Sequence, residues 1–131
     1  MVLAMASLDV QADLIRRLSD AFPNATVARH VPAKRPDLLI TVRREGGRRL
    51  NGLQDAPGVG IEVWASTDYA CARTADGVAD FMEGLSFSDG YERVTQEAEY
   101  SDPDTASKAP RWYLSYSLVT HVPAASSKTK G

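Results

Sequence analysis

The chain has 131 residues, of which 44% are hydrophobic and 24% are charged, and its formal net charge is −2. This is the usual length of one domain, and it is long enough to bury a core without a disulfide or a metal ion. The near-balanced charge excludes a strongly basic nucleic-acid-coating domain and a strongly acidic solvating tail. Cys71 is the only cysteine, so no internal disulfide can form.

The sequence predicts neither a membrane partner nor export. The apolar first residues, 1–6, lack a basic region and are too few for the apolar core of a signal peptide. No apolar run approaches the roughly 18 residues of a membrane-spanning helix. We therefore expect a protein that is made without export.

The first predicted element is an amphipathic helix over residues 8–22. Apolar side chains recur there at intervals of three and four, which places them on one helical face. They are Leu8, Ala12, Ile15, Leu18 and Phe22. Ser7 or Asp9 can cap the start of this helix, and Pro23 ends the pattern.

Three strands are predicted next. Residues 26–30 form a brief run that nearby prolines confine to a sheet edge, and residues 38–43 alternate as a half-buried strand does. Residues 45–58 contain glycines, a proline and polar side chains, and we predict a long loop there that can include a hairpin turn at Gly46 and Gly47. Residues 59–65 form the strongest strand. Its two faces carry, respectively, Val59, Ile61 and Val63, and Glu62 and Trp64.

A second helix is predicted over residues 67–85, with Thr67 as its cap and Asp68 at its positive end. Cys71 lies in this Ala-rich segment, and we expect it to be buried as a small apolar residue. The apolar stripe consists of Ala72, Ala75, Val78, Ala79, Met82 and Leu85.

Two more strands, residues 91–100 and 112–118, are predicted to form a long hairpin around residues 101–110. In the first, Val94, Ala98 and Tyr100 share one face, and Arg93, Thr95, Glu97 and Glu99 share the other. In the second, Trp112, Leu114, Tyr116 and Leu118 lie opposite Tyr113, Ser115 and Ser117. Residues 124–131 have too little apolar content to pack, which predicts a disordered tail.

This order of elements predicts an α+β fold in a single domain of residues 1–123. We expect a mostly antiparallel sheet of four to five strands with two helices packed on one face. The other face would carry polar and aromatic side chains, among them Glu62, Trp64 and Tyr113. An exposed pair of Trp64 and Tyr113 would mark an interface. Alternatively, a loop such as residues 45–58 covers both rings.

Residues that could support catalysis are few, and we predict no catalytic, cofactor or metal site. His30, His121 and Cys71 do not form the spaced pairs that zinc sites use. The acidic residues Glu97, Glu99, Asp102 and Asp104 are close in sequence. They could bind a divalent cation, but Asp-Pro-Asp is also ordinary turn chemistry, and a solvated loop explains them as well.

Four arginines give the sharpest charge feature: Arg43, Arg44, Arg48 and Arg49. They can contact phosphates or a partner's carboxylates, or they can form a solvated strand end and loop. No aromatic residue accompanies them, so the stacking platform of single-strand binders is missing. We therefore expect no sequence-specific binding of nucleic acid.

Three segments in succession resemble the tail terminator proteins of long-tailed, siphovirus-like bacteriophages, particularly those of actinobacterial hosts. They are residues 35–44 with the following Gly46 and Gly47, residues 59–65 leading into the Ala-rich helix, and residues 102–118. The resemblance spans most of residues 8–121 and leaves the tail outside.

This resemblance implies a structural virion protein of the tail and neck, assembled in the host cytoplasm, without catalytic residues or cofactors. Such proteins form a ring, commonly a hexamer, that caps the tail tube, stops its elongation and joins it to the head connector. DNA passes through the lumen without sequence-specific binding. A closed ring needs two different patches that meet between copies. Candidate interface residues are Arg43, Arg44, Arg48, Arg49, Glu62, Trp64, Asp102, Asp104 and Tyr113.

In that interpretation, the predicted loop over residues 45–58, with its arginines, reaches a neighbouring copy or the lumen. Asp102 and Asp104 supply the opposite charge. Three alternatives remain open at this point. The first is another neck component, such as a head-completion or connector protein. The second is a small metal-dependent hydrolase that uses the acidic residues. The third is a cytosolic regulatory domain that stays a monomer or dimer.

Overall fold

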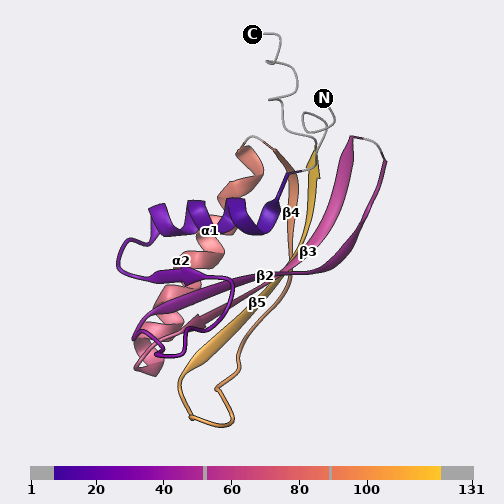
Figure 1. Ribbon diagram of the computed structural model, residues 1–131. Coiled ribbons are helices and arrows are strands. Elements are labelled where there is room, and N and C mark those ends of the chain that lie inside the picture. Colours follow the sequence, from indigo (N-terminus) through magenta and orange to yellow (C-terminus); the bar gives the residue numbers. More distant parts are fainter. Residues whose placement is uncertain (1–7, 52, 89, 122–131) are drawn as a thin grey trace.

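Five strands form one sheet in the order β1-β2-β3-β5-β4, and two helices lie on one side of it (Figure 1). The computed structural model describes residues 8–51, 53–88 and 90–121. The helical elements are α1 (Val10–Ala21), α2 (Asp68–Gly84) and the short 3-10 helix η2 (Leu85–Phe87). The strands are β1 (Thr26–Ala28), β2 (Leu39–Arg49), β3 (Gln54–Trp64), β4 (Tyr91–Ser101) and β5 (Arg111–His121).

Strand β1 pairs with β2 in parallel, and all other neighbouring strands are antiparallel. The predicted α+β class, with a mostly antiparallel sheet and two helices, is therefore confirmed. β1 is short and lies at the sheet edge, as the prolines that follow it predicted. The predicted cap Ser7 and the predicted disordered tail 124–131 lie outside the described residues. Within the described residues, no helix is long and apolar enough to span a membrane.

Helix α1 begins as its sequence predicts, but its buried face is rotated from the predicted one. The Asp9 carboxylate accepts a hydrogen bond from the Ala12 N–H at 3.1 Å, which satisfies one of the free donors at the helix start. The fully buried residues are Val10, Leu14 and Leu18. Ala12, which we expected on the apolar face, is exposed. The larger Val10 and Leu14 fill the core instead because they bury more apolar surface.

Helix α2 lies close to the sheet because its inward face carries small residues. Thr67 caps it, as predicted, by accepting from the Ala70 N–H at 3.1 Å. The buried residues are Cys71, Ala75, Val78 and Met82. The Cys71 thiol donates to the Val63 carbonyl at 3.1 Å, and burial raises the pKa of that thiol. The expected burial of Cys71 is therefore confirmed.

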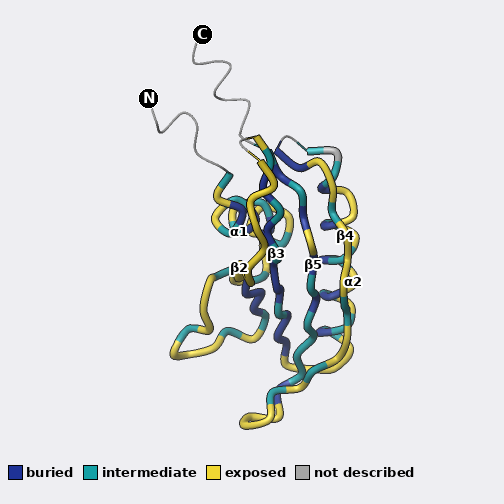
Figure 2. The backbone as a smooth tube through the Cα atoms, turned by 90° about the vertical axis from the view of Figure 1, so that its right-hand side faces the viewer, coloured by how far each residue is buried: buried dark blue, intermediate teal, exposed yellow. Residues whose placement is uncertain are grey.

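The core fills the space between both helices and one sheet face. Val59, Ile61 and Val63 of β3 face the helices and are at most 1% exposed. Their partners in register on β2 and β5 include Ile40, Val42 and Leu114, which are fully buried. Burial of each such side chain contributes about 1.5–3 kcal/mol. Figure 2 looks onto the opposite, open face, and the helices lie behind the strands.

The segment that follows α1 contacts α2. A side-chain carbon added at Gly77 of α2 would lie 3.1 Å from Cε2 of Phe22, the C-cap residue of α1. The missing side chain at Gly77 thus leaves room for the Phe22 ring. The prediction that both helices pack on one face agrees with this contact and with the shared core cluster.

The predicted loop over residues 45–58 is wrong, because β2 and β3 continue through most of it as one long hairpin. Gly46 and Gly47 adopt φ angles of +108° and +98° and form a bulge instead of a turn. A side chain at Gly47 would collide with the Ala56 carbonyl. The turn comes later, where the Asn51 side chain accepts from the Gln54 N–H at 2.9 Å.

The predicted faces of β4 are also wrong beyond its middle. A bulge between Gln96 and Ala98 shifts the register, so that Ala98 pairs with Ser115 and Glu99 pairs with Leu114. Val94 and Ala98 therefore face opposite sides, because a bulge adds one residue to an alternating strand. Glu99, predicted on the polar face, lies on the side of the helices.

Candidate interaction surfaces

The predicted aromatic pair lies on the open face, as expected, but only one ring is partly accessible. Trp64 is 6% exposed. Tyr113 is half-buried, and its ring centroid lies 5.5 Å from that of Tyr100, which is 48% exposed. Glu62 lies between β2 and β5 on the same face and accepts from the Thr41 hydroxyl at 3.3 Å.

Two arginines cover Trp64. The guanidinium carbon of Arg35 lies 4.9 Å from the Trp64 ring centroid, and that of Arg111 lies 5.0 Å from it. Such contacts combine cation–π attraction with apolar cover. Leu39 and Ala109 complete this small cluster. The prediction that Trp64 is exposed together with Tyr113 is therefore wrong for Trp64. The residues that cover Trp64 come from segments other than residues 45–58.

The same Arg111 binds the acidic loop. Its guanidinium Nη2 lies 3.1 Å from Asp102 Oδ2, and its Nη1 lies 3.5 Å from Asp104 Oδ1. Glu62 Oε2 lies 4.0 Å from Arg111 Nη1, and Arg111 Nε donates to the Asp102 carbonyl at 2.8 Å. The Arg111 side chain is only 17% exposed. We call Arg111, Glu62, Asp102 and Asp104 the arginine cluster.

Hydrogen bonds from Ser107 lower the pKa of Asp104. The Ser107 hydroxyl donates to Asp104 Oδ2 at 2.7 Å, and the Ser107 N–H donates to it at 2.8 Å. These bonds hold the pKa of Asp104 below its ordinary value, and the nearby charges of Arg111 and Arg35 act in the same direction. The carboxylates of the loop are thus balanced within the chain.

The four predicted arginines lie along β2, but they differ in their contacts. Arg44 bridges the hairpin to Asp55, with Nη2 to Oδ2 at 3.2 Å. Arg43 lies 3.9 Å from Glu45, which accepts from the Tyr113 hydroxyl at 2.6 Å. Burial raises the pKa of Tyr113, and its hydrogen bond to Glu45 raises it further.

Beyond the bulge, the hairpin carries exposed basic and apolar side chains. Arg48 and Arg49 are exposed, Leu50 is 42% exposed and Leu53 is 65% exposed. We call residues 48–51 together with Leu53 the hairpin tip. Large apolar side chains that remain exposed beside cations are typical of surfaces that bind another chain.

The hairpin tip and the acidic loop lie at opposite ends of the sheet (Figure 1). Gln54, at the tip, pairs with His121, whereas Trp64, at the other end of β3, pairs with Arg111. The structure therefore does not bring Arg48 and Arg49 near Asp102 and Asp104.

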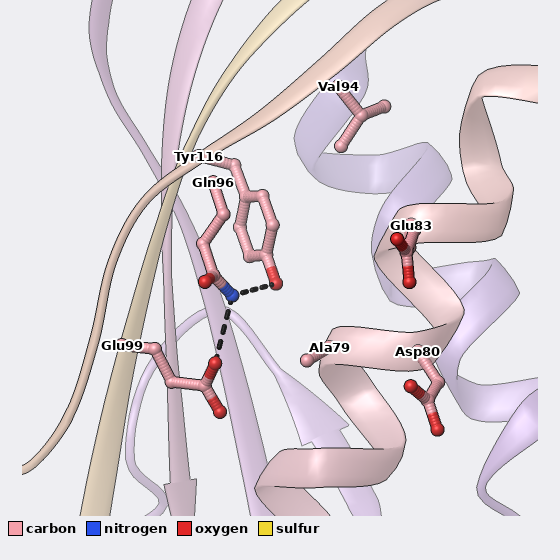
Figure 3. Close-up of a pocket in the computed structure, with 7 residues that line it drawn as sticks. All are labelled: Ala79, Asp80, Glu83, Val94, Gln96, Glu99 and Tyr116. Atoms are coloured by element: carbon pink, nitrogen blue, oxygen red, sulfur yellow. Dashed lines mark hydrogen bonds between the residues drawn. The ribbon is translucent and has the colours of Figure 1, made fainter.

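A groove that the sequence did not reveal opens between α2 and β4. Ala79, Asp80 and Glu83 of α2 face Val94, Gln96 and Glu99 of β4 across it, with Tyr116 of β5 at its base (Figure 3). Its volume is about 270 Å³. Sequence analysis missed it because the bulge in β4 moves Glu99 onto this side. We call it the α2–β4 groove.

Hydrogen bonds inside the groove connect Gln96, Glu99 and Tyr116. Gln96 Nε2 donates to the Tyr116 hydroxyl and to Glu99 Oε1, each at 3.0 Å. Burial raises the pKa of Tyr116, and the negative charges of Glu99 and Glu83 raise it further. Glu99 and Glu83 thus place negative charge near the Tyr116 hydroxyl at the base of the groove.

The residues weighed for metal or nucleophilic chemistry are separated. Cys71 is buried on the sheet-facing side of α2, His30 is exposed, and His121 Nδ1 lies 3.4 Å from Glu92 Oε2. Glu99 faces the groove, while Asp102 and Asp104 bind Arg111. In the described part of the chain, no group of three or more His, Cys, Asp or Glu residues is placed to hold a metal ion.

Neither a protein-family model nor a curated protein sequence matches this chain.

Proposed function

We propose that the chain is a structural virion protein, a phage tail terminator that forms a ring on the tail tube. In this role, the ring stops tube elongation and presents a surface to the head connector. The succession of segments described above supports the tail as its location. The distribution of charge across the sheet supports assembly into a ring.

One observation carries the proposal: the two edges of the sheet, β2 at one and β4 with the adjacent helix α2 at the other, have opposite charge. β2 contains four arginines and one glutamate. At the other edge, α2 and β4 together contain seven carboxylates and two arginines. β4 is an edge strand, and β1 covers only the first part of β2. In the described residues, the outer side of β4 pairs with no strand.

Opposite patches on opposite edges favour a head-to-tail contact between copies. Such a contact is heterologous, and it closes into a ring when the rotation between copies divides a full turn. Like-charged edges repel each other, so the charges disfavour a symmetric pairing of two β4 strands or two β2 strands. The resemblance implies a ring that is commonly a hexamer, and the charges alone fix no oligomer number.

The experiment combines purified protein with purified tail tubes and, separately, with portal-bearing heads. Electron microscopy should show a ring on one end of the tubes, and tube growth should stop when the protein is present. Binding to heads alone would instead support another neck component, such as a connector. Absence of rings in solution, on tubes and on heads would contradict the proposal.

A further inference from the structure

We propose that the hairpin tip of one copy docks into the α2–β4 groove of the next copy. This inference rests on the proposed ring, and it assigns the two surfaces that meet. The groove has an apolar floor and an acidic rim, and the tip has apolar and basic side chains. Each surface therefore presents what the other lacks.

The rim of the groove has carboxylates without matching cations. Asp80 and Glu83 are exposed on α2, and no ion pair is found for them within the described residues. Glu99 accepts from Gln96, a neutral donor. Arg73, the one arginine of α2, lines an adjoining hollow with Asp76 and Asp80. An incoming guanidinium group would add the charge-assisted hydrogen bonds that carboxylates favour.

The floor of the groove is suited to an apolar side chain and one backbone group. Ala79 and Val94 are half-buried, and the Tyr116 ring closes the base (Figure 3). The Tyr116 hydroxyl accepts from Gln96, and its own proton has no acceptor among the described residues. A carbonyl of an inserted turn can accept this proton. Buried polar groups are usually satisfied in this way.

The tip offers the complementary side chains on a projecting hairpin. Leu53 is the more exposed of its two leucines. Arg48 and Arg49 are exposed at the end of β2, one on each face of the hairpin. Leucine anchors with arginines around them resemble the centre and rim of protein interfaces. The bulge at Gly46 and Gly47 bends the arm that carries the tip.

The tip of a chain cannot enter its own groove. The strands β3 and β5 lie between β2 and β4, so these two strands are separated by three strand spacings, roughly 14 Å. Next to the tip, Gln54 Nε2 donates to Glu92 Oε1 at 2.7 Å, which ties the hairpin to the start of β4. The groove also opens on the side of the helices. A second copy is therefore the occupant that this geometry favours, and the same pairing repeats around a ring.

A charge exchange tests the docking. The variant with Arg48→Glu and Arg49→Glu should associate at least about tenfold more weakly than the wild type. The variant with Asp80→Arg and Glu83→Arg should be weakened similarly. Combining all four substitutions should restore association, because the two surfaces are again complementary. Sedimentation velocity measures the association, and circular dichroism checks folding.

The matched control changes two other exposed cations, Arg29→Glu and Lys34→Glu, and should retain wild-type association. Docking is overturned if the variant with Arg48→Glu and Arg49→Glu associates as the wild type does. It is also overturned if the variant with all four substitutions associates no more tightly than the two double variants. In those cases the ring itself still stands. A wild type that never assembles overturns both the docking and the ring.

Discussion

Two groups of carboxylates, one in the loop between β4 and β5 and one beside α2, differ in how their charge is balanced. In the arginine cluster, Asp102 and Asp104 surround one guanidinium that is itself stacked on Trp64. In the α2–β4 groove, Asp80 and Glu83 face Glu99 without a cation between them. The first group stabilises this chain, whereas the second is available to another chain. Acidic residues close in sequence therefore need not act together.

Because of this difference, we expect substitution of Arg111 to reduce the stability of the fold more than substitution of any groove carboxylate. Arg111→Ala removes the cation that forms ion pairs with both Asp102 and Asp104, and it uncovers one face of Trp64. We expect the free energy of unfolding to fall by about 2 kcal/mol, because charge-assisted hydrogen bonds of Arg111 and its contact with the Trp64 ring are lost. Urea unfolding measures it.

A conservative variant sharpens the same point. Arg111→Lys keeps the charge but loses the planar fork and the stacking on Trp64, so it should recover only part of the stability. A loss below about 0.5 kcal/mol for Arg111→Ala would place this cluster among ordinary surface pairs.

Acid should remove part of the stabilisation by the arginine cluster. The pKa of Asp104 is lowered in the folded chain, so its contribution is fully present above the ordinary carboxyl pKa. That contribution is lost as the pH falls through the lower, folded-state value. Asp104→Asn should therefore be less stable than the wild type at neutral pH. The difference should shrink in acid, where the wild-type carboxyl is protonated.

Thermal unfolding at neutral and acidic pH measures this difference. Ser107→Ala, which removes the hydroxyl bound to Asp104, is the matched variant and should show a smaller change with the same pH dependence. A constant gap between wild type and Asp104→Asn at all pH values would contradict the assignment.

The groove should give the smallest effect on stability. Asp80→Asn combined with Glu83→Gln removes charges that form no ion pair within the described residues. We expect the free energy of unfolding to change by no more than about 0.5 kcal/mol. A loss as large as that of Arg111→Ala would show that these carboxylates are structural, and the comparison between the two groups would fail.

Local signals predicted much of the fold. Alternation placed Ile61 and Leu114 on the core face, and the caps Asp9 and Thr67 mark the helix starts. Bulges caused the main errors. A glycine pair at positive φ suits a turn and a bulge equally well, so Gly46 and Gly47 did not distinguish between them.

The interaction surfaces were harder to predict than the elements. The cover on Trp64 comes from Arg35 and Arg111, which are far from each other in sequence, and no local pattern encodes that contact. Glu99 reaches the groove only because a bulge precedes it. By contrast, Arg48 and Arg49 could be identified as exposed cations from their residue type and from the polar residues next to them in the sequence.

Sedimentation velocity of the full chain, at low and at high salt, tests the central claim most directly. The account predicts one closed oligomer at low salt that dissociates toward the monomer as salt screens the contact between the basic and acidic edges. Electron microscopy of the low-salt sample should show rings with a central hole. A chain that remains monomeric at high protein concentration and low salt, and that also forms no ring on tail tubes or heads, would contradict the account.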